Sequence, residues 1–337
     1  MNRRAFNKTM VGASMIILQG MPEKTKSRYL MPGDKVGLIC PASPITQEKL
    51  DKAIDNLKSI GLIPVPGRHI LDQAGYLAGK DQNRLSDLHE MYRDDTIKAI
   101  WCIRGGYGCT HLLPDLDLDL IRTHPKLLIG YSDVTALHLA LYTEAGQHNL
   151  HGPVASSDFT AYSVDMLRKV IFGSSGQSFQ IKPCEENDAV SAEGKTTFDR
   201  FVINDGQARG HLWGGNLSLL SAMSGTEYLK IKKDTLLFLE DIEEAPYRID
   251  RMLTQMFQAL PLSKIKGVIV GVCEGCEKKP DSNSFTLREV MMDRIAKLKV
   301  PAVYGFPIGH IANQCTLPIG ASAILNTSDF SLEVRLP

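Results

Sequence analysis

Ser132, Glu240 and His310 are residue types that together support nucleophilic catalysis, and each follows an apolar segment of the chain. A serine hydroxyl is a weak nucleophile unless a neutral imidazole takes its proton, and a carboxylate fixes the imidazole tautomer and stabilises the imidazolium. The chain order serine, acid, histidine also occurs in α/β hydrolases. We therefore interpret Ser132 as a candidate nucleophile, Glu240 as a candidate orienting acid and His310 as a candidate general base.

Each of these residues also has a simpler structural interpretation. A serine at a strand-to-helix turn is commonly a helix N-cap. The segment from Gly130 to Val134 also lacks the second glycine of a G-x-S-x-G nucleophile elbow. A lone histidine is more often structural than catalytic, and the acidic run from Glu240 to Glu244 is typical of a solvated loop. The occurrence of all three residue types at expected strand ends is what favours catalysis.

A glycine-rich turn, Gly105-Gly106-Tyr107-Gly108, follows the apolar segment of residues 98–104. It does not match the dinucleotide motif G-x-G-x-x-G, because His111 occupies the last position, and the chain has no P-loop motif. Since Gly106 has no Cβ atom, a substrate can approach its backbone N–H, which makes the turn a candidate oxyanion hole. Further candidates for substrate contact in glycine-rich segments are Tyr107, Trp213 and Asn216.

The elements that must position these residues follow an alternating pattern in the first half of the chain. Helical stripes at 45–60, 84–94 and 134–144 alternate with apolar strands at 34–40, 62–65, 98–104 and 127–131. Such alternation predicts a parallel sheet covered on both faces, with functional groups at the strand carboxyl ends.

The second half of the chain is expected to form another α/β unit. A polar, turn-rich segment at 173–206 separates the two halves, and the glycine-rich segment at 210–216 is expected to be a loop leading into a helix. Apolar strands are expected at 235–239, 266–272 and 302–308, ending at Glu240 and His310, and a closing hairpin at 322–335.

The composition is that of an ordinary globular chain, with 337 residues and 43% hydrophobic residues. Lysine plus arginine and aspartate plus glutamate both number 38, so the net charge is zero, which argues against a general nucleic-acid binder. The chain has no apolar run long enough for a membrane-spanning helix. The seven cysteines indicate mostly free thiols, and Cys273-x-x-Cys276 lacks a second pair at zinc-site spacing, so no metal site is expected.

The start of the chain is similar to an export signal. Arg3-Arg4 is followed by Phe6, Lys8 and a mildly apolar segment at 10–18, which resembles the twin-arginine consensus. A clean A-x-A cleavage site is absent. We therefore expect residues 1–28 to be a signal-like segment that directs a folded protein to the periplasm. A cytoplasmic protein with a basic terminus is the alternative.

Six segments together resemble the LD-carboxypeptidases, the serine peptidases of bacterial murein recycling. They are IRGGYG (103–108), LIGYSDVTALHLAL (128–141), HGP (151–153), GHLWGGNLSLL (210–220), LLFLEDIEEAPYRIDRML (236–253) and YGFPIGH (304–310). The resemblance implies a triad of Ser132, Glu240 and His310. It also implies an oxyanion hole from the backbone N–H groups of Gly106 and Asp133.

The resemblance further implies an architecture of two domains with the active site between them. An N-terminal flavodoxin-like parallel-sheet domain is expected at 29–175, a connection at 176–206 and a smaller C-terminal α/β domain at 207–337. A homodimer is implied as well.

Under this resemblance, the expected substrate is a murein tetrapeptide from which Ser132 releases a terminal D-Ala. Arg104 is a candidate for binding the free carboxylate of the substrate, and no metal or organic cofactor is required. A relative with the same triad that hydrolyses microcin-type antibiotic amides is one alternative. A non-catalytic periplasmic binding protein of two α/β domains is another.

Overall fold

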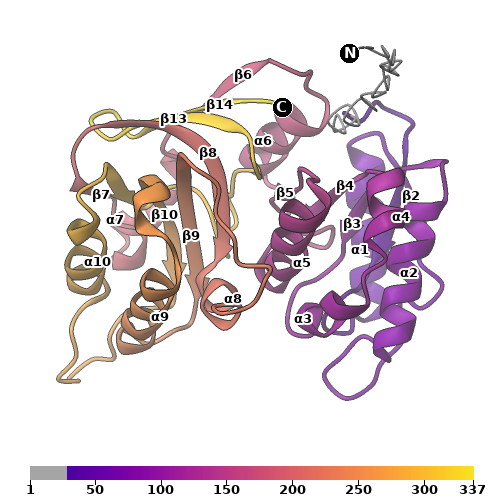
Figure 1. The fold of residues 1–337 in the computed structure, drawn as a ribbon, viewed down its shortest axis with the longest axis horizontal. Coiled ribbons are helices and arrows are strands. Elements are labelled where there is room, and N and C mark those ends of the chain that lie inside the picture. The colour runs from indigo at the N-terminus through magenta and orange to yellow at the C-terminus, as the bar shows by residue number, and fades with distance from the viewer. Residues whose placement is uncertain (1–28) are drawn as a thin grey trace, which may run out of the picture.

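The computed structural model describes residues 29–337, and Figure 1 shows two α/β halves side by side. Within these residues, the strands form one sheet of six and one of eight. The expected twin-arginine segment, residues 1–28, lies outside the described residues. None of the helices in the described part of the chain has the length and apolar character needed to cross a membrane.

The N-terminal sheet has the strand order β2-β1-β3-β4-β5, with β12 added beyond β5. Neighbours from β2 to β5 are parallel, which is the flavodoxin-like order and confirms the expected fold of this half. The strands are β1 (Lys35–Ile39), β2 (Ile63–Pro66), β3 (Ile97–Cys102), β4 (Leu127–Gly130), β5 (Leu150–His151) and β12 (Leu317–Pro318). The helices of this half are α1 (Gln47–Ser59), α2 (Asp81–Arg93), α3 (Cys109–Leu112), α4 (Leu118–Thr123), α5 (Thr135–Ala140) and α6 (Ala161–Ile171).

Helix α1 shows why these segments fold as the pattern predicts. The Thr46 side chain accepts the backbone N–H of Lys49 and so caps the helix N-terminus. Leu50, Ala53 and Leu57 recur at helical spacing and are buried against the sheet side of the helix. The helix thus obtains its start from a cap and its orientation from one apolar face.

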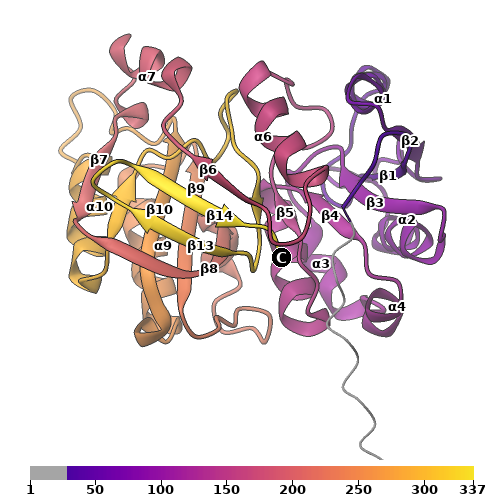
Figure 2. The same cartoon turned by 90° about the horizontal axis from the view of Figure 1, so that it is seen from above.

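The C-terminal sheet has the order β6-β14-β13-β8-β9-β10-β11-β7. Its strands are β6 (Ser178–Ile181), β7 (Phe201–Asn204), β8 (Gln207–Asn216), β9 (Thr235–Ile242), β10 (Ile265–Glu274), β11 (Ala302–Tyr304), β13 (Ser322–Asn326) and β14 (Ser331–Arg335). The helices are α7 (Glu185–Ala192), α8 (Leu217–Ala222), α9 (Pro246–Ala259) and α10 (Leu287–Ile295). The antiparallel pair β13–β14, yellow in Figure 2, confirms the expected hairpin.

Two segments contain more regular structure than their composition predicts. Residues 176–206, expected as a connection, contribute β6 and β7, the two edge strands of the C-terminal sheet, together with α7. The expected loop at 210–216 is instead the second half of β8. Gly214 and Gly215 have φ near 150°, and Cβ atoms at these positions would collide with Phe238 and Thr135. Glycine therefore serves close strand packing here rather than a turn.

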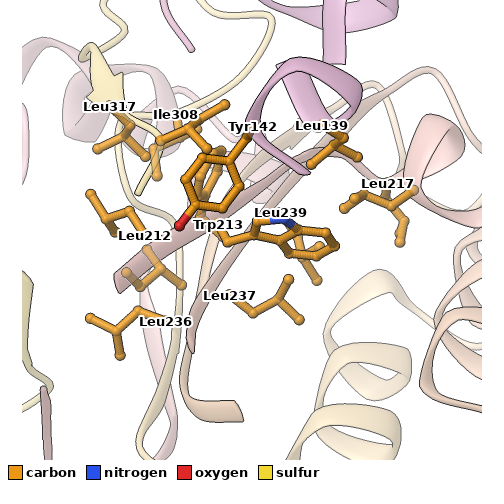
Figure 3. Packing of buried hydrophobic residues seen from close by; sticks show 14 of the residues in the cluster. Leu139, Tyr142, Leu212, Trp213, Leu217, Leu236, Leu237, Leu239, Ile308 and Leu317 are labelled. Carbon is orange, nitrogen blue, oxygen red and sulfur yellow. The ribbon is translucent and has the colours of Figure 1, made fainter. Parts of the chain in front are cut away.

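A shared apolar core fixes the two halves relative to each other. Figure 3 shows side chains of Leu139 and Tyr142, from the N-terminal half, packed with Trp213, Leu217 and Leu239 of the other half. Burying one such leucine contributes about 1.5–3 kcal/mol. In addition, β12 leaves the C-terminal half of the chain to pair with β5 in the N-terminal sheet.

Candidate active site

Ser132 lies in the turn between β4 and α5, at the start of the short 3-10 segment η2 (Ser132–Val134). Its φ of 63° is in the left-handed region, which costs a non-glycine residue about 1–3 kcal/mol. The N-cap positions of η2 and α5 are Tyr131 and Val134, and neither uses a side-chain cap hydrogen bond. These facts argue against the N-cap interpretation of Ser132 and favour a strained strand-to-helix turn that exposes a nucleophile.

Two glycines explain how this turn fits although Val134 replaces the second glycine of the elbow motif: Gly105 on the adjacent turn, and Gly130, the first glycine of the motif itself. A Cβ atom on Gly105 would lie 2.9 Å from the Cβ of Ser132. A Cβ atom on Gly130 would lie 3.1 Å from a methyl group of Val134. The space that the motif normally obtains from its second glycine is provided here by the missing Cβ atoms of Gly105 and Gly130.

His310 and Glu240 form a direct pair, with His310 Nδ1 2.8 Å from Glu240 Oε2. Burial of Glu240, which is 0% exposed, opposes its ionisation, but the charge and hydrogen bond of His310 outweigh burial and lower the pKa of Glu240. Burial also opposes protonation of His310, yet Glu240 raises the pKa of His310 above the ordinary 6.5. Because Nδ1–H donates to the carboxylate, Nε2 is the nitrogen that can accept a proton.

The strands do not end where the sequence predicted. Strand β9 continues past Glu240 to Ile242, because Asp241 and Ile242 still pair with β10. Strand β11 ends at Tyr304, and His310 lies in the loop that follows. Gly309, with φ of 121°, brings this loop to Glu240, since a Cβ atom there would lie 3.1 Å from the Cβ of Glu240.

Tyr131 connects the two halves of the site. Its ring centroid lies 4.7 Å from that of His310, and Ser132 is the next residue in the chain. Within residues 29–337, no hydrogen bond joins Ser132 to His310. Catalytic hydrogen bonds are often long in a free enzyme and tighten only with substrate.

The turn from Gly105 to Gly108 lies beside Ser132 and presents free backbone N–H groups. Gly106 has φ of 112°, and a Cβ atom there would collide with Ser43. The Ser43 hydroxyl accepts the backbone N–H of Tyr107 at 3.2 Å and so helps to fix the position of the turn. In the described part of the chain, no backbone–backbone hydrogen bond uses the N–H of Gly106 or Asp133 as donor. Both N–H groups can therefore bind an oxyanion.

The buried side chains of Asp133, which the resemblance implied only for its backbone N–H, and of Arg84, which the sequence did not single out, hold the loops around Ser132. The carboxylate of Asp133 accepts the N–H of Cys109 at 2.7 Å, and burial raises the pKa of Asp133. The fully buried guanidinium of Arg84 donates to the carbonyl oxygens of Pro41 and Gly108. The only sequence signal for Arg84 is its position on the apolar side of α2. In the sequence, this signal does not distinguish a buried arginine from a solvated one on a charged helix.

His151, noted only as part of the HGP segment, lies against the same groups. Its ring contacts Tyr131 and Phe238 at centroid distances of 6.1 and 5.2 Å. Neither ring nitrogen has a hydrogen-bond partner among residues 29–337. Burial lowers the pKa of His151 to about 4, against the opposing charge of Glu240, so the ring is neutral at ordinary pH.

Two protein-family models match the sequences of the two halves of the chain. The LD-carboxypeptidase N-terminal domain matches residues 36–152, and the LD-carboxypeptidase C-terminal domain matches residues 209–325. The chain belongs to the LD-carboxypeptidase family. The resemblance inferred from the six segments is thereby confirmed.

Individual relatives of this LD-carboxypeptidase-family chain agree with that assignment. A Bacillus subtilis protein named "Probable murein peptide carboxypeptidase" is 40% identical over 90% of this chain and 92% of the relative. The murein tetrapeptide carboxypeptidase of Pseudomonas aeruginosa is 31% identical over 86% of this chain and 92% of its own. These matches identify the chain as a serine-type carboxypeptidase, and hence as an enzyme.

Solved structures show the same two-domain fold. A muramoyltetrapeptide carboxypeptidase from Oxalobacter formigenes has a TM-score of 0.77 at 28% identity and covers 90% of this chain and 99% of its own. An MccF-like protein from Bacillus anthracis has a TM-score of 0.80 at 26% identity, covering 92% of this chain and 99% of its own. The family fold therefore includes both murein-type and MccF-like proteins.

The four residues expected to contact substrate have different surroundings. Arg104 and Tyr107 are exposed; Arg104 donates to the Pro44 carbonyl at 2.9 Å, and the Tyr107 hydroxyl lies 3.2 Å from His111 Nε2. Trp213 is only 1% exposed and packs in the core of Figure 3, which argues against direct contact with a substrate. Asn216 is 3% exposed; its side-chain oxygen caps α8 by accepting the N–H of Leu219, and its amide nitrogen donates to Asp241.

The cysteines of this LD-carboxypeptidase-family chain are all reduced and buried. All seven cysteines fall within the described residues and are buried free thiols. Cys276 Sγ accepts the N–H of Glu244, and the hydrogen bond of Cys276, with burial, raises the pKa of Cys273. No cluster of three metal-binding side chains occurs within residues 29–337.

Proposed function

We propose that the protein is a serine carboxypeptidase that hydrolyses the L,D-peptide bond of a murein tetrapeptide and releases its terminal D-Ala. The observation that carries the proposal is the 2.8 Å pairing of His310 with buried Glu240, next to the strained turn of Ser132. The names of the Bacillus and Pseudomonas relatives support the choice of substrate.

In the first step, Ser132 Oγ attacks the carbonyl carbon of the scissile amide while His310 Nε2 takes the hydroxyl proton. The bond from Oγ to carbon forms, and the carbon–nitrogen bond breaks as His310 returns that proton to the nitrogen of the leaving D-Ala. Glu240 remains ionised, because its pKa is lowered, and stabilises the imidazolium. The N–H groups of Gly106 and Asp133 stabilise the negative charge on the carbonyl oxygen.

The second step hydrolyses the acyl-enzyme. His310 takes a proton from water, whose oxygen attacks the ester carbon. The proton then passes to Ser132 Oγ as the tripeptide leaves with a free carboxylate. The same base and the same oxyanion donors serve both steps, so no metal or organic cofactor enters the proposal.

Incubation of the purified chain with murein tetrapeptide, with detection of free D-Ala, tests this function. We expect release by the wild type and a loss of about 10⁵–10⁶-fold in kcat for Ser132→Ala. Ser59→Ala, at the exposed end of α1, is the matched control and should keep full activity. A wild-type protein that releases no D-Ala would contradict the proposal.

A microcin-type amide hydrolase is the second candidate, favoured by the structural similarity to the MccF-like protein. It would use the same Ser132, Glu240 and His310, so the triad does not separate the two. Turnover of a microcin-type amide faster than that of the tetrapeptide would favour it. A non-catalytic binding protein would show no turnover, and Ser132→Ala would leave its ligand affinity unchanged.

Location and assembly belong to the same proposal. Arg3-Arg4 supports export to the periplasm, where the enzyme would meet the cell wall itself and act in its remodelling. The family resemblance supports a homodimer. Cell fractionation of the wild type and of a variant with both arginines changed to lysine tests export, and light scattering of the purified protein tests the dimer.

A further inference from the structure

Two hollows of different chemistry flank the groups proposed to react. The polar hollow, of about 290 Å³, is lined by His310 and Tyr131 together with Lys52, Ser156, Ser157 and Gln314. The apolar hollow, of about 560 Å³, is lined by Gly106 and Asp133 together with Leu113, Leu219, Met223 and Tyr228. The base thus faces one hollow and the oxyanion donors face the other.

The chemistry of the proposed reaction decides which part of the substrate lies on the His310 side. The proton that His310 takes from the nucleophile must pass to the nitrogen of the leaving group. The leaving nitrogen therefore lies within hydrogen-bond reach of His310, and the rest of the leaving amino acid must extend into space next to that ring. Of the two hollows, only the polar hollow has His310 in its lining.

The polar hollow offers partners for both charged ends of a free amino acid. Lys52, on α1, is its cation, and half-exposed Lys52 can approach a carboxylate. Gln314 is 3% exposed, and its Oε1 has no hydrogen-bond partner in the described part of the chain. A buried, unpaired carbonyl oxygen is unfavourable unless a ligand donates to it, and an amino group is such a donor.

We propose that the polar hollow binds the C-terminal amino acid that is released, with Lys52 contacting its carboxylate and Gln314 Oε1 accepting from its amino nitrogen. This assignment rests on the proposed function and gives carboxylate recognition to Lys52 rather than to Arg104. Arg104 lines neither hollow, and its guanidinium donates to the Pro44 carbonyl. A free terminal carboxylate on the substrate is then a requirement of the site and explains why the enzyme acts as a carboxypeptidase.

Asp158 provides an internal control for this proposal. Its carboxylate lies 2.5 Å from Lys52 Nζ, at the edge of the same hollow. Without substrate, Lys52 is therefore paired with Asp158, and a bound carboxylate must compete for the ammonium group. Removing the charge of Asp158 should favour substrate binding, whereas removing the charge of Lys52 should weaken it.

The test compares tetrapeptides that end in D-Ala with a free carboxylate or with a carboxamide. For Lys52→Met, we expect kcat/KM on the free acid to fall roughly tenfold, through KM, which corresponds to one charge-assisted hydrogen bond. The carboxamide should lose much less, so the preference of the wild type for the free acid collapses. For Asp158→Asn, KM for the free acid should fall, and the ratio of free acid to carboxamide should rise.

The outcomes separate this proposal from the proposed function. If the wild type cleaves neither peptide, the proposed function fails. If the wild type cleaves the free acid but Lys52→Met keeps its preference for it, the assignment of Lys52 is overturned. Equal losses in both variants would mean that the two residues form only a structural ion pair, and unfolding midpoints of both variants show whether the fold is intact.

Discussion

The two halves of the molecule hold their parts of the proposed site in different ways. In the N-terminal half, Ser132 and Gly106 both have positive φ, and hydrogen bonds from Arg84 and to Asp133 hold the surrounding loops. In the C-terminal half, Glu240 and His310 are joined by a contact between two titratable groups. Activity should therefore be sensitive to the loss of buried hydrogen bonds in the N-terminal half, which we call the nucleophile side. In the C-terminal half, the acid–base side, it should be sensitive to changes of charge and pH.

The largest effect is expected for Glu240→Gln, on the acid–base side. The amide keeps the size of the side chain but removes the charge that stabilises the His310 imidazolium and fixes its tautomer. We expect kcat to fall by about 10⁴-fold, with KM little changed. Release of D-Ala under saturating substrate measures it, and a loss of less than tenfold would contradict the role of Glu240.

A smaller effect, on both stability and activity, is expected for Arg84→Met in the N-terminal half. The change leaves the carbonyl oxygens of Pro41 and Gly108 without their buried donor, at about 1–3 kcal/mol each. We expect a loss of roughly 2–4 kcal/mol in the free energy of unfolding, measured in urea. Displacement of the Gly106 turn should also lower kcat by about 10–100-fold.

Arg294→Met is the matched control in the C-terminal half. Arg294 pairs with Asp250 in a partly exposed salt bridge, at an Nε–Oδ1 distance of 2.5 Å. Such a pair contributes about 0–1 kcal/mol, and neither residue lines the two hollows beside the proposed catalytic groups. If Arg84→Met and Arg294→Met have equal effects on kcat, the idea that Arg84 positions the oxyanion turn is wrong.

The smallest effects concern pH and are expected on the acid–base side. Catalysis requires neutral His310, whose pKa is raised above 6.5 by Glu240 despite burial, so kcat/KM should fall as the pH drops through a value above 6.5. In Glu240→Gln, burial of His310 is opposed only by the charges of Asp241 and Glu274, so the acid limb of the residual activity should move to lower pH. An unchanged limb would show that another group sets the profile.

The stability of the pair follows from the same shifts. The lowered pKa of Glu240 contributes stability above 4.5 that is lost as the pH falls, and the raised pKa of His310 contributes stability below 6.5 that is lost as the pH rises. The difference in unfolding free energy between the wild type and Glu240→Gln should therefore be greatest between about pH 4.5 and 6.5.

The fold was predictable where local pattern and burial agree. Parallel strands buried on both faces read as continuous apolar runs, so β3 and β4 could be found within a few residues of their ends. The residue types at the ends of such runs indicated Ser132, Glu240 and His310. Prediction was poorer where glycine had an unexpected use, as in β8, whose Gly214 and Gly215 serve close packing rather than a turn.

Side-chain environment was the least predictable property. Trp213 and Asn216 lie in a glycine-rich segment that suggested an open loop, yet this segment pairs with β9 and both residues are buried. Arg84 looked like one more charge on a solvated helix, although it is fully buried under the glycine turn. A single sequence does not show which distant residues pack against a given side chain, so these buried positions could not be distinguished from exposed ones.

The amino-acid sequence was enough to predict which chemistry is available and the order of the elements that carry it. Residue types set which groups can attack, accept a proton or orient a base, and apolar periodicity set the alternation of strands and helices. The φ of Ser132, the burial of Glu240 and its contact with His310 across 70 residues of chain became apparent only in the folded protein. Those properties arise from contacts between distant segments, which no local pattern encodes.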